Sequence, residues 1–251
     1  MKEILKLESV SLAYHTPHGE IVALKNLCMS VNNGEFVAII GPSGCGKTSI
    51  LSMIAGLIKP SGGKVVYKGE TVGKPNGNIG YMLQRDELFE WRTIEKNAYL
   101  PLEIKGINTA ENRERVNSLL KKYDLWDFRR SNPSRLSGGM RQRAALIRTL
   151  STSPELLLLD EPFSALDYQT RLNVCDDVYS IIKGEKKTAV LVTHDISEAI
   201  AMADRIYVLT KRPSSVLAEH VVDLDKSLPP IRRRECERFG KYFELIRKEL
   251  E

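Results

Sequence analysis

The sequence contains few cysteines and no long apolar run. Its four cysteines lie far apart in 251 residues and form no CxxC pair, which argues against a disulfide framework or a zinc site. No apolar stretch approaches the ~20 residues that a membrane-spanning helix needs, and the first residues do not resemble a signal peptide. These absences predict a protein of a reducing compartment, the cytoplasm, whose chain does not itself cross a membrane.

An excess of charge of one sign is also missing. The net charge is +5, and the basic residues are scattered apart from the run at 232–234. Nucleic-acid binders usually gather such charge on one face. We therefore expect solvated surface at 232–234 and no nucleic-acid partner. The hydrophobic content of 42% and the charged content of 27% are ordinary for a globular protein.

Apolar runs without polar alternation mark the strands expected at the centre of the fold. Such runs indicate strands buried on both faces of a parallel sheet, and the helices between them predict right-handed crossovers. They lie at 35–40, 156–159, 188–193 and 205–209. Other strands are expected at 5–10, 21–31, 65–67 and 79–83, with a turn-rich loop at 15–20 and a helix over 47–57.

A helical block and a helical tail depart from this pattern. The sequence predicts that residues 89–152 form helices inserted into a domain of residues 1–225, and that Ser137 is the N-cap of one of these helices. Residues 226–251 predict a tail whose last helix has one apolar face. We expect that face to pack on the domain rather than on a membrane surface. It comprises Cys236, Phe239, Tyr242, Phe243, Ile246 and Leu250.

The stretch 41-GPSGCGKT-48 follows a predicted buried strand and precedes a predicted helix, the context that a phosphate-binding loop requires. Its glycines let backbone N–H groups surround a phosphate. Lys47 is expected to reach the β- and γ-phosphates, and the Thr48 hydroxyl to bind Mg²⁺. Cys45, at the helix start, is expected to be a reactive thiol. The expected nucleotide contacts are Gly41, Pro42, Ser43, Gly44, Cys45, Gly46, Lys47, Thr48 and Ser49.

Polar residues follow three of the predicted strands. Asp160 is expected to hold Mg²⁺, and Glu161 to polarise a water for hydrolysis. Gln84 and His194 end two other strands, where polar residues often only cap a turn. Because the carboxyl ends of parallel strands share one edge, we expect Gln84 to contact Mg²⁺ or water and His194 to donate to the γ-phosphate.

A second turn suited to an anion stands at 137–139, where Ser-Gly-Gly offers a hydroxyl and free N–H groups at a helix start. Taken alone, it is more simply an ordinary N-cap. The inserted block holds this turn away from the phosphate loop of its own chain. We therefore expect it to serve the nucleotide of a second copy, with the two chains arranged head to tail.

Together these motifs resemble the ATP-binding subunit of an ABC transporter. The phosphate loop, Gln84, 136-LSGGMRQR-143, 156-LLLLDE-161, 164-SALD-167 and His194 occur in the order and spacing of that family. The resemblance implies an α/β P-loop ATPase with a mostly parallel sheet core, an antiparallel β subdomain and an inserted helical subdomain. It also implies that Tyr14 stacks on adenine, that Ser137, Gly138 and Gly139 contact the second copy's γ-phosphate, and that Asp167 couples the two sites.

The resemblance further implies what the protein does. Two copies are expected to close around two ATP molecules with Mg²⁺ and to power a membrane permease, which holds them at the cytoplasmic face of the cell membrane. A solute-binding protein would take part indirectly. The stretches 83–100 and 224–234 are similar to the nitrate, sulfonate and taurine importers, which implies uptake of a small anion or organic solute.

The permease is expected to dock beside Gln84, where Leu88, Phe89 and Trp91 cluster; a core role for these three is the alternative. Two other functions were weighed. Soluble ABC ATPases that act without transport carry two such domains in one chain or long inserted coiled coils, and neither feature occurs here. Glu161 and His194 argue against a regulatory module that only binds ATP.

Overall fold

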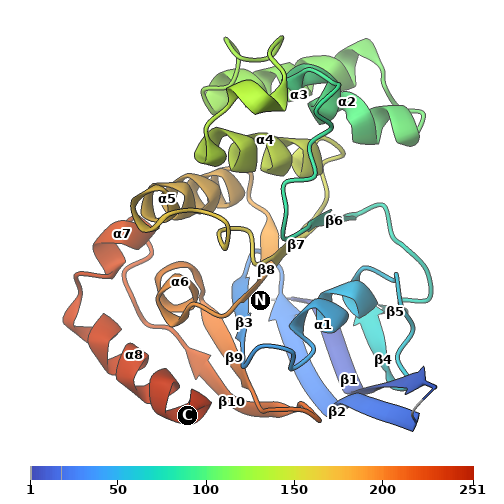
Figure 1. The fold of residues 1–251 in the computed structure, drawn as a ribbon, viewed down its shortest axis with the longest axis vertical. Coiled ribbons are helices and arrows are strands. Elements are labelled where there is room, and N and C mark those ends of the chain that lie inside the picture. Colours follow the sequence, from blue (N-terminus) through green and yellow to red (C-terminus); the bar gives the residue numbers. More distant parts are fainter. Residues whose placement is uncertain (1, 18) are drawn as a thin grey trace.

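The computed structural model describes residues 2–17 and 19–251, which form two sheets and a group of helices (Figure 1). The larger sheet has the strand order β10-β9-β3-β8-β7-β6, and its neighbours are parallel except for β10 and β9. The predicted parallel sheet is thus confirmed. Its strands are β3 (Phe36–Ile40), β6 (Ile79–Met82), β7 (Leu156–Asp160), β8 (Thr188–Thr193), β9 (Arg205–Leu209) and β10 (Val216–Val221).

Strand β3 lies between two apolar cores. Phe36, Ala38 and Ile40 belong to one buried cluster, and Val37 and Ile39 to another, because successive side chains of a strand point to opposite faces. Residues from α2 (Ile94–Ile104) to α6 (Ile196–Met202), including α4 (Gly138–Leu150), and from α8 (Glu237–Leu250) complete the first cluster. Helix α1 (Lys47–Ile54) and the smaller sheet complete the second. Helices α1 and α4 therefore lie on opposite faces of the parallel sheet.

The smaller sheet is antiparallel, with the order β2-β1-β4-β5. The predicted loop at 15–20 is too long: β1 continues to Thr16, β2 starts at Gly19, and His15 pairs with Glu20. Both side chains are exposed, so backbone pairing rather than apolar burial extends this hairpin beyond its alternating pattern. The strands are β1 (Glu3–Thr16), β2 (Gly19–Asn32), β4 (Gly62–Tyr67) and β5 (Glu70–Thr71).

Helix α1 (Lys47–Ile54) is shorter than the predicted 47–57. The chain turns at Gly56, and the N–H of Leu57 bonds back to the carbonyl of Ser52 at 2.9 Å. The apolar residues after Ile54 therefore follow the turn instead of extending the helix.

Helices α2 (Ile94–Ile104), α3 (Ala110–Lys122) and α4 (Gly138–Leu150) form a helical arm above both sheets in Figure 1. Each begins at a capping residue whose side-chain hydroxyl accepts a backbone N–H of the first turn. These residues are Thr93, Thr109 and Ser137 respectively. Helix α4 packs against α2 and also against α5 (Tyr168–Gly184), so it connects the arm to the rest of the molecule.

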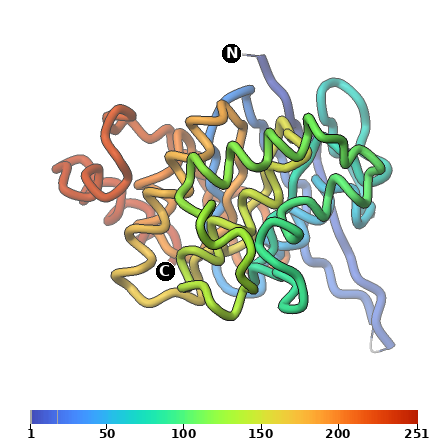
Figure 2. The backbone as a smooth tube through the Cα atoms, turned by 90° about the horizontal axis from the view of Figure 1, so that it is seen from above, coloured from blue at the N-terminus to red at the C-terminus, as the bar shows by residue number. Residues whose placement is uncertain are grey.

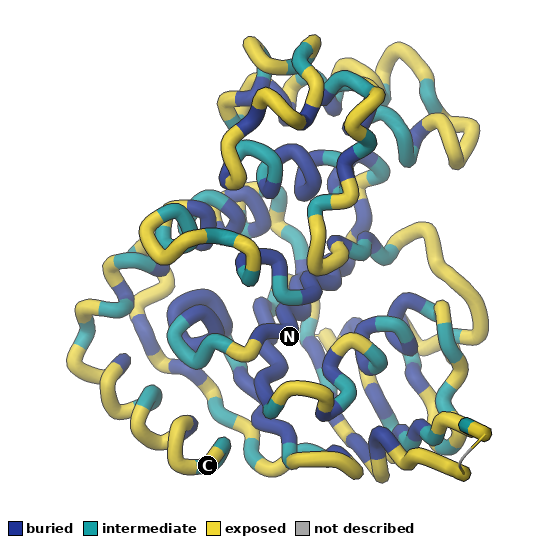
Figure 3. The backbone as a smooth tube through the Cα atoms, in the orientation of Figure 1, coloured by how far each residue is buried: buried dark blue, intermediate teal, exposed yellow. Residues whose placement is uncertain are grey.

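The chain ends in α7 (Pro230–Arg233) and α8 (Glu237–Leu250), which follow α6 (Ile196–Met202) and strands β9 and β10. Seen from above, these helices and the β1–β2 hairpin lie at opposite ends of the molecule (Figure 2). Phe239 and Ile246 are buried, and the other four residues of the predicted apolar face pack on the main core. That prediction is confirmed; the outer side of α8 is largely exposed (Figure 3). Nowhere in residues 2–17 and 19–251 is a helix both long and apolar enough to span a bilayer.

The run 232–234 is only partly the solvated surface that we expected. Arg232 is exposed, but Arg233 is 0% exposed and lies against the ring of Tyr179, 4.4 Å from its centroid. Its guanidinium donates to the Tyr179 hydroxyl at 2.6 Å, to the Ala201 carbonyl at 2.8 Å and to the carbonyls of three residues at the start of the tail and just before it, Asp225, Lys226 and Leu228. Arg233 therefore ties the tail to the C-terminal parts of α5 and α6.

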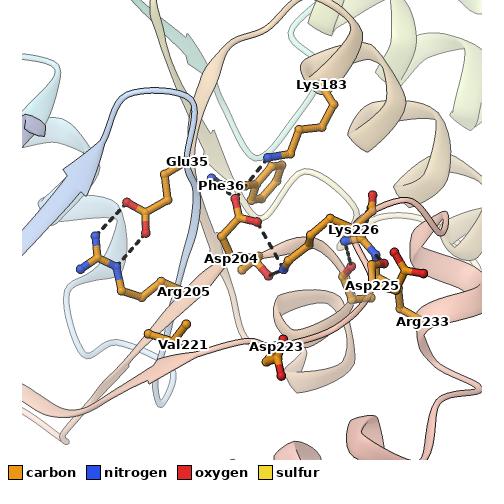
Figure 4. Close-up of polar contacts among 12 residues, drawn as sticks. Glu35, Phe36, Lys183, Asp204, Arg205, Val221, Asp223, Asp225, Lys226 and Arg233 are labelled. Carbon is orange, nitrogen blue, oxygen red and sulfur yellow. Dashed lines mark hydrogen bonds and ion pairs between the residues drawn. The ribbon is translucent and has the colours of Figure 1, made fainter. Parts of the chain in front are cut away.

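A second polar group ties the tail to the sheet (Figure 4). Asp204, just before β9, accepts the N–H of Phe36 at 2.7 Å and contacts the ammonium groups of Lys183 at 3.1 Å and Lys226 at 3.3 Å. Burial raises the pKa of Asp204, but these three donors outweigh it and leave the pKa below its usual value. The start of β3, helix α5 and the tail thus share one carboxylate.

We expect Arg233→Met to lower the free energy of unfolding by about 3 kcal/mol, because it leaves buried acceptors without donors. Urea unfolding measures this change. Arg232→Met is the matched control: the exposed side chain of Arg232 pairs with the equally exposed Glu235, so its loss should change stability by less than about 1 kcal/mol. Equal losses in the two variants would contradict the structural role of Arg233.

Candidate functional site

Strands β3, β8, β7 and β6 end side by side. Ile40 pairs with Thr193, Val192 with Asp160, and Leu159 with Met82. The phosphate loop, His194, Glu161 and Gln84 each follow one of these ends. The register of the sheet therefore collects residues from four distant parts of the chain at the edge where α/β proteins bind ligands.

The phosphate loop turns sharply into α1. Gly46 is the N-cap with a φ of 103°, a conformation that other residues rarely adopt. The buried Lys47 ammonium donates to the carbonyls of Gly41 at 2.8 Å and Pro42 at 3.1 Å, so it lies against the loop. The loop thus combines free N–H groups at a helix start with a fixed positive charge, which suits a phosphate.

Cys45 does not have the role expected of its side chain. The thiol is only 1% exposed and belongs to the apolar core beneath the loop. The expectation of a reactive thiol is therefore wrong, because the loop turns this side chain inward. The loop residues Ser43, Gly44 and Thr48 are exposed instead.

Asp160 ends β7 beside the phosphate loop. It accepts hydrogen bonds from the Thr48 hydroxyl at 3.1 Å and from the Tyr81 hydroxyl at 3.2 Å. Burial raises the pKa of this carboxyl above its usual value. A carboxylate and a hydroxyl so close together are the hard oxygen ligands that Mg²⁺ prefers, and a cation there would favour the ionised carboxylate. These residues fit a bound Mg²⁺.

Glu161 faces a different partner from Asp160. Its φ of 43° is unusual for a residue other than glycine, and its N–H donates to the carbonyl of Val192 at 2.9 Å. Its Oε2 lies 3.0 Å from Nδ1 of the exposed His194. The turn after β7 therefore separates the two carboxylates, one towards Thr48 and one towards His194.

Tyr14, on β1, reaches the same region. Its hydroxyl lies 2.8 Å from the Ser49 hydroxyl in the first turn of α1, and its side chain is exposed. The ring therefore stands next to the phosphate loop on the surface.

The 137–139 turn lies in the helical arm. The Ser137 hydroxyl accepts the N–H of Met140 at 3.3 Å and is exposed together with Gly138. A Cβ on Gly138 would lie 2.9 Å from Leu166, and one on Gly139 would lie 2.8 Å from Val174, so larger residues would push the turn away from the α5 region. Since α4 and α1 cover opposite faces of the sheet, the structure does not bring this turn to its own phosphate loop.

Asp167 and Gln84 occupy two further positions near the arm. Asp167 caps α5, and hydrogen bonds from the Thr170 side chain and backbone lower its pKa. Gln84 is exposed in a groove with Arg141 and Ala165. No hydrogen bond among the described residues joins Gln84 to Thr48 or Asp160.

Two residues of the site were missed in the sequence. Tyr81 is in β6, where its hydroxyl gave no signal that it would face Asp160. Glu198 is buried in α6 and accepts the Thr193 hydroxyl at 2.6 Å, next to His194. Burial raises the pKa of Glu198 to about 7, although Arg171 lies 3.9 Å away. Its place in the sequence, three residues after Asp195, gave no sign that the carboxyl would be buried.

Comparison with known proteins identifies the class. A family model described as ABC transporter matches residues 24–164. The uncharacterized ABC transporter ATP-binding protein YtlC of Bacillus subtilis is 44% identical over 249 residues, which cover 98% of this chain and 95% of YtlC. The nitrate import ATP-binding protein NrtD of Synechocystis sp. is 34% identical over 241 residues, which cover 95% of this chain and 91% of NrtD.

A solved structure supports the same assignment. The ATP-binding cassette MJ0796, a dimer bound to ADP and Pi in a post-hydrolysis state, superposes with a TM-score of 0.74 at 33% identity, covering 87% of this chain and 99% of that chain. The chain belongs to the ABC transporter family. More particularly, it has the ABC cassette fold and is an ABC-type ATPase.

We expect Glu198→Gln to remove a pH dependence of stability. The folded-state pKa of Glu198 is about 7 against an ordinary 4.5, so the fold loses stability as pH rises from about 4.5 to 7. The amide cannot ionise, so the free energy of unfolding of the variant should rise relative to that of the parent, by up to about 3 kcal/mol at pH 8. Urea unfolding from pH 5 to 8 measures the difference, with the exposed Glu244→Gln as the control. A difference that stays constant with pH would contradict the buried acid.

Proposed function

We propose that two copies of this chain close around two ATP molecules, each with Mg²⁺, and that this closure drives a membrane permease. The observation that carries the proposal is the placement of two turns of a kind suited to anions, 41–48 and 137–139, each with exposed residues, at helices on opposite faces of one sheet. A single chain cannot use both turns for one phosphate. The neighbour MJ0796, which forms a dimer, supports the pairing of two copies.

In this arrangement each residue of the site has a distinct task. Lys47 and the loop N–H groups bind the β- and γ-phosphates, and Tyr14 stacks on adenine. Thr48, Asp160 and Gln84 would hold Mg²⁺, which neutralises charge on the phosphates. Glu161 polarises the attacking water, and His194 orients Glu161 and donates to the γ-phosphate. Ser137, Gly138 and Gly139 complete the site of the other copy, and Asp167 couples the two sites.

The permease would dock on the loop between β6 and α2. Trp91 is 76% exposed and stacks on Phe89 at a centroid distance of 4.6 Å, whereas Leu88 is buried. Leu88 is therefore part of the core, the alternative role weighed for these residues, whereas Trp91 is not. An exposed aromatic stack of this kind is typical of a protein interface.

The transported solute is proposed from the relatives. NrtD is named for nitrate import, and 83–100 and 224–234 resemble the nitrate, sulfonate and taurine branch. We therefore assign this ATPase to an importer of a small anion or organic solute such as a sulfonate. A solute-binding protein would deliver the solute, and the ATPase would sit at the cytoplasmic face of the membrane through its permease. This proposal also divides the chain into an ATPase domain at 1–225, with a helical insertion at 89–152, and a C-terminal tail at 226–251.

Glu161→Gln tests the shared site. Loss of the base should slow hydrolysis by about 10²–10⁴-fold while Lys47 and Asp160 still bind the nucleotide. ATP, and not ADP, should then convert monomer to dimer in size-exclusion chromatography at high protein concentration.

Adding Ser137→Arg should abolish that dimer without weakening ATP binding by the monomer, because it places bulk and positive charge in the second turn. Ser180→Arg, a like change on an exposed part of α5, is the control. If the double mutant Glu161→Gln/Ser137→Arg dimerises as well as Glu161→Gln alone, the 137–139 turn is only a helix cap.

Trp91→Ala tests the docking surface. It should leave ATP-driven dimerisation intact, because Trp91 is exposed and remote from the core. The tagged chain, recovered from detergent-solubilised membranes of its native cells, should bring down about tenfold less permease, the loss expected at an interface hot spot. Ile104→Ala, which removes an equally exposed apolar group from the arm, is the control. Unchanged recovery with Trp91→Ala would place the docking surface elsewhere.

A further inference from the structure

A bidentate ion pair joins the 86–90 segment to the first turn of α4. The Arg141 Nε lies 2.8 Å from Asp86 Oδ2, and its Nη2 lies 3.0 Å from Asp86 Oδ1. The remaining nitrogen, Nη1, lies 2.8 Å from Glu90 Oε1. Both Arg141 and Asp86 are largely shielded from solvent, so this pair is held more firmly than a surface salt bridge.

A second arginine fastens the same segment farther along the helix. Arg148 follows Arg141 by seven residues and so lies on the same side of α4. Its guanidinium donates to the carbonyls of Asp86 and Glu87, both at 2.6 Å. Asp86 also accepts the N–H of Leu88 at 3.0 Å. The 86–90 segment is therefore bound along α4 through both its backbone and its side chains.

The exposed Trp91 stack is fixed to that segment. The buried Asn97 amide accepts the N–H of Phe89 at 2.7 Å and donates to the carbonyls of Phe89, Arg92 and Thr93. These bonds close the chain around Trp91 into one turn. A displacement of the Trp91 surface must therefore be carried to Asp86 rather than absorbed in a loose loop.

The other end of the ion pair reaches the 137–139 turn. The N–H of Arg141 donates to the Ser137 carbonyl at 2.9 Å, one helical turn away. The side chains of Leu166 and Val174 lie so close to Gly138 and Gly139 that a Cβ on either glycine would come within 3 Å of them, so the turn is packed against the α5 region. Arg141 thus stands between the two exposed surfaces of the arm.

We propose that the Asp86–Arg141 ion pair is a positioning device that transmits movement between the Phe89–Trp91 surface and the Ser137 turn. The inference rests on the proposed function, since it requires Ser137 to engage the nucleotide of a second copy. Asp86 and Arg141 are positioning residues, which act through the Phe89–Trp91 surface on one side and the Ser137 turn on the other. When Ser137 is held by a phosphate, the ion pair stabilises the 86–92 segment, and when Trp91 is held by a partner, it fixes the Ser137 turn.

Amide hydrogen exchange on the full-length Glu161→Gln protein tests this link without a permease. With saturating ATP, we expect exchange to slow in both 136–143 and 86–92, by about tenfold, the size of a typical coupling between sites. Ser137→Arg, which prevents engagement of the second turn, should remove the slowing in both segments although ATP remains bound.

The decisive variant is Arg141→Met in the same background. At a protein concentration where it dimerises, ATP should still slow exchange in 136–143 but no longer in 86–92. Arg143→Met, which removes an arginine on α4 that contacts Asp177 and Tyr123 instead, should behave like the parent. Asp86→Asn, which keeps the size of the side chain, should reproduce Arg141→Met and serves in its place should Arg141→Met fail to fold.

The outcomes separate the two proposals. Absence of an ATP-dependent dimer in the parent would overturn the shared site and, with it, this inference. A dimer in which 86–92 does not slow, or in which both Arg141→Met and Asp86→Asn slow like the parent, would overturn the positioning role and leave the shared site intact. If the ion pair were purely structural, its loss would raise exchange equally with and without ATP, and the slowing of exchange in 86–92 by ATP would remain.

Discussion

The parallel register of four short strands is the constraint on which the site depends. Pairing of β3 with β8, β8 with β7, and β7 with β6 aligns strand ends that lie far apart in the chain. Because these strands are buried on both faces, a slip of one residue would move apolar side chains into the wrong core. The packing that stabilises the fold therefore also sets the distances among Thr48, Asp160 and Glu161.

The same sheet explains why the two anion-binding turns lie apart. Helix α1 packs on the side of Val37 and Ile39, while α4 belongs to the core on the other side. Helix α1 begins just after β3, whereas α4 begins within the arm after α3, so the two helices present their N–H groups on different parts of the surface. The arm is joined to the rest mainly through α4, which places Ser137 and the Trp91 stack on one structural unit.

Much of this could be predicted from the sequence, because buried parallel strands, glycine-rich loops and helix caps leave strong local patterns. Asp160 and Lys47 follow from such patterns. The length of the β1–β2 hairpin could not be predicted in this way, because backbone pairing extends the hairpin through polar residues. Cys45 was misjudged because its orientation depends on the core beneath the loop. Arg233, Glu198 and Tyr81 could not be found, since a charged or phenolic group in a sequence carries no sign of being buried.

The two arginine attachments differ in how salt affects them. Arg233 holds the tail through carbonyls, a hydroxyl and an aromatic face, all buried, so dissolved ions have no opposite charge to compete for. Arg141 holds the 86–90 segment through two carboxylates, one of them half exposed. Ionic strength screens such pairs. A rise in salt should therefore weaken the attachment of the 86–90 segment to α4, chiefly at the half-exposed Glu90, more than it weakens the attachment that Arg233 gives the tail.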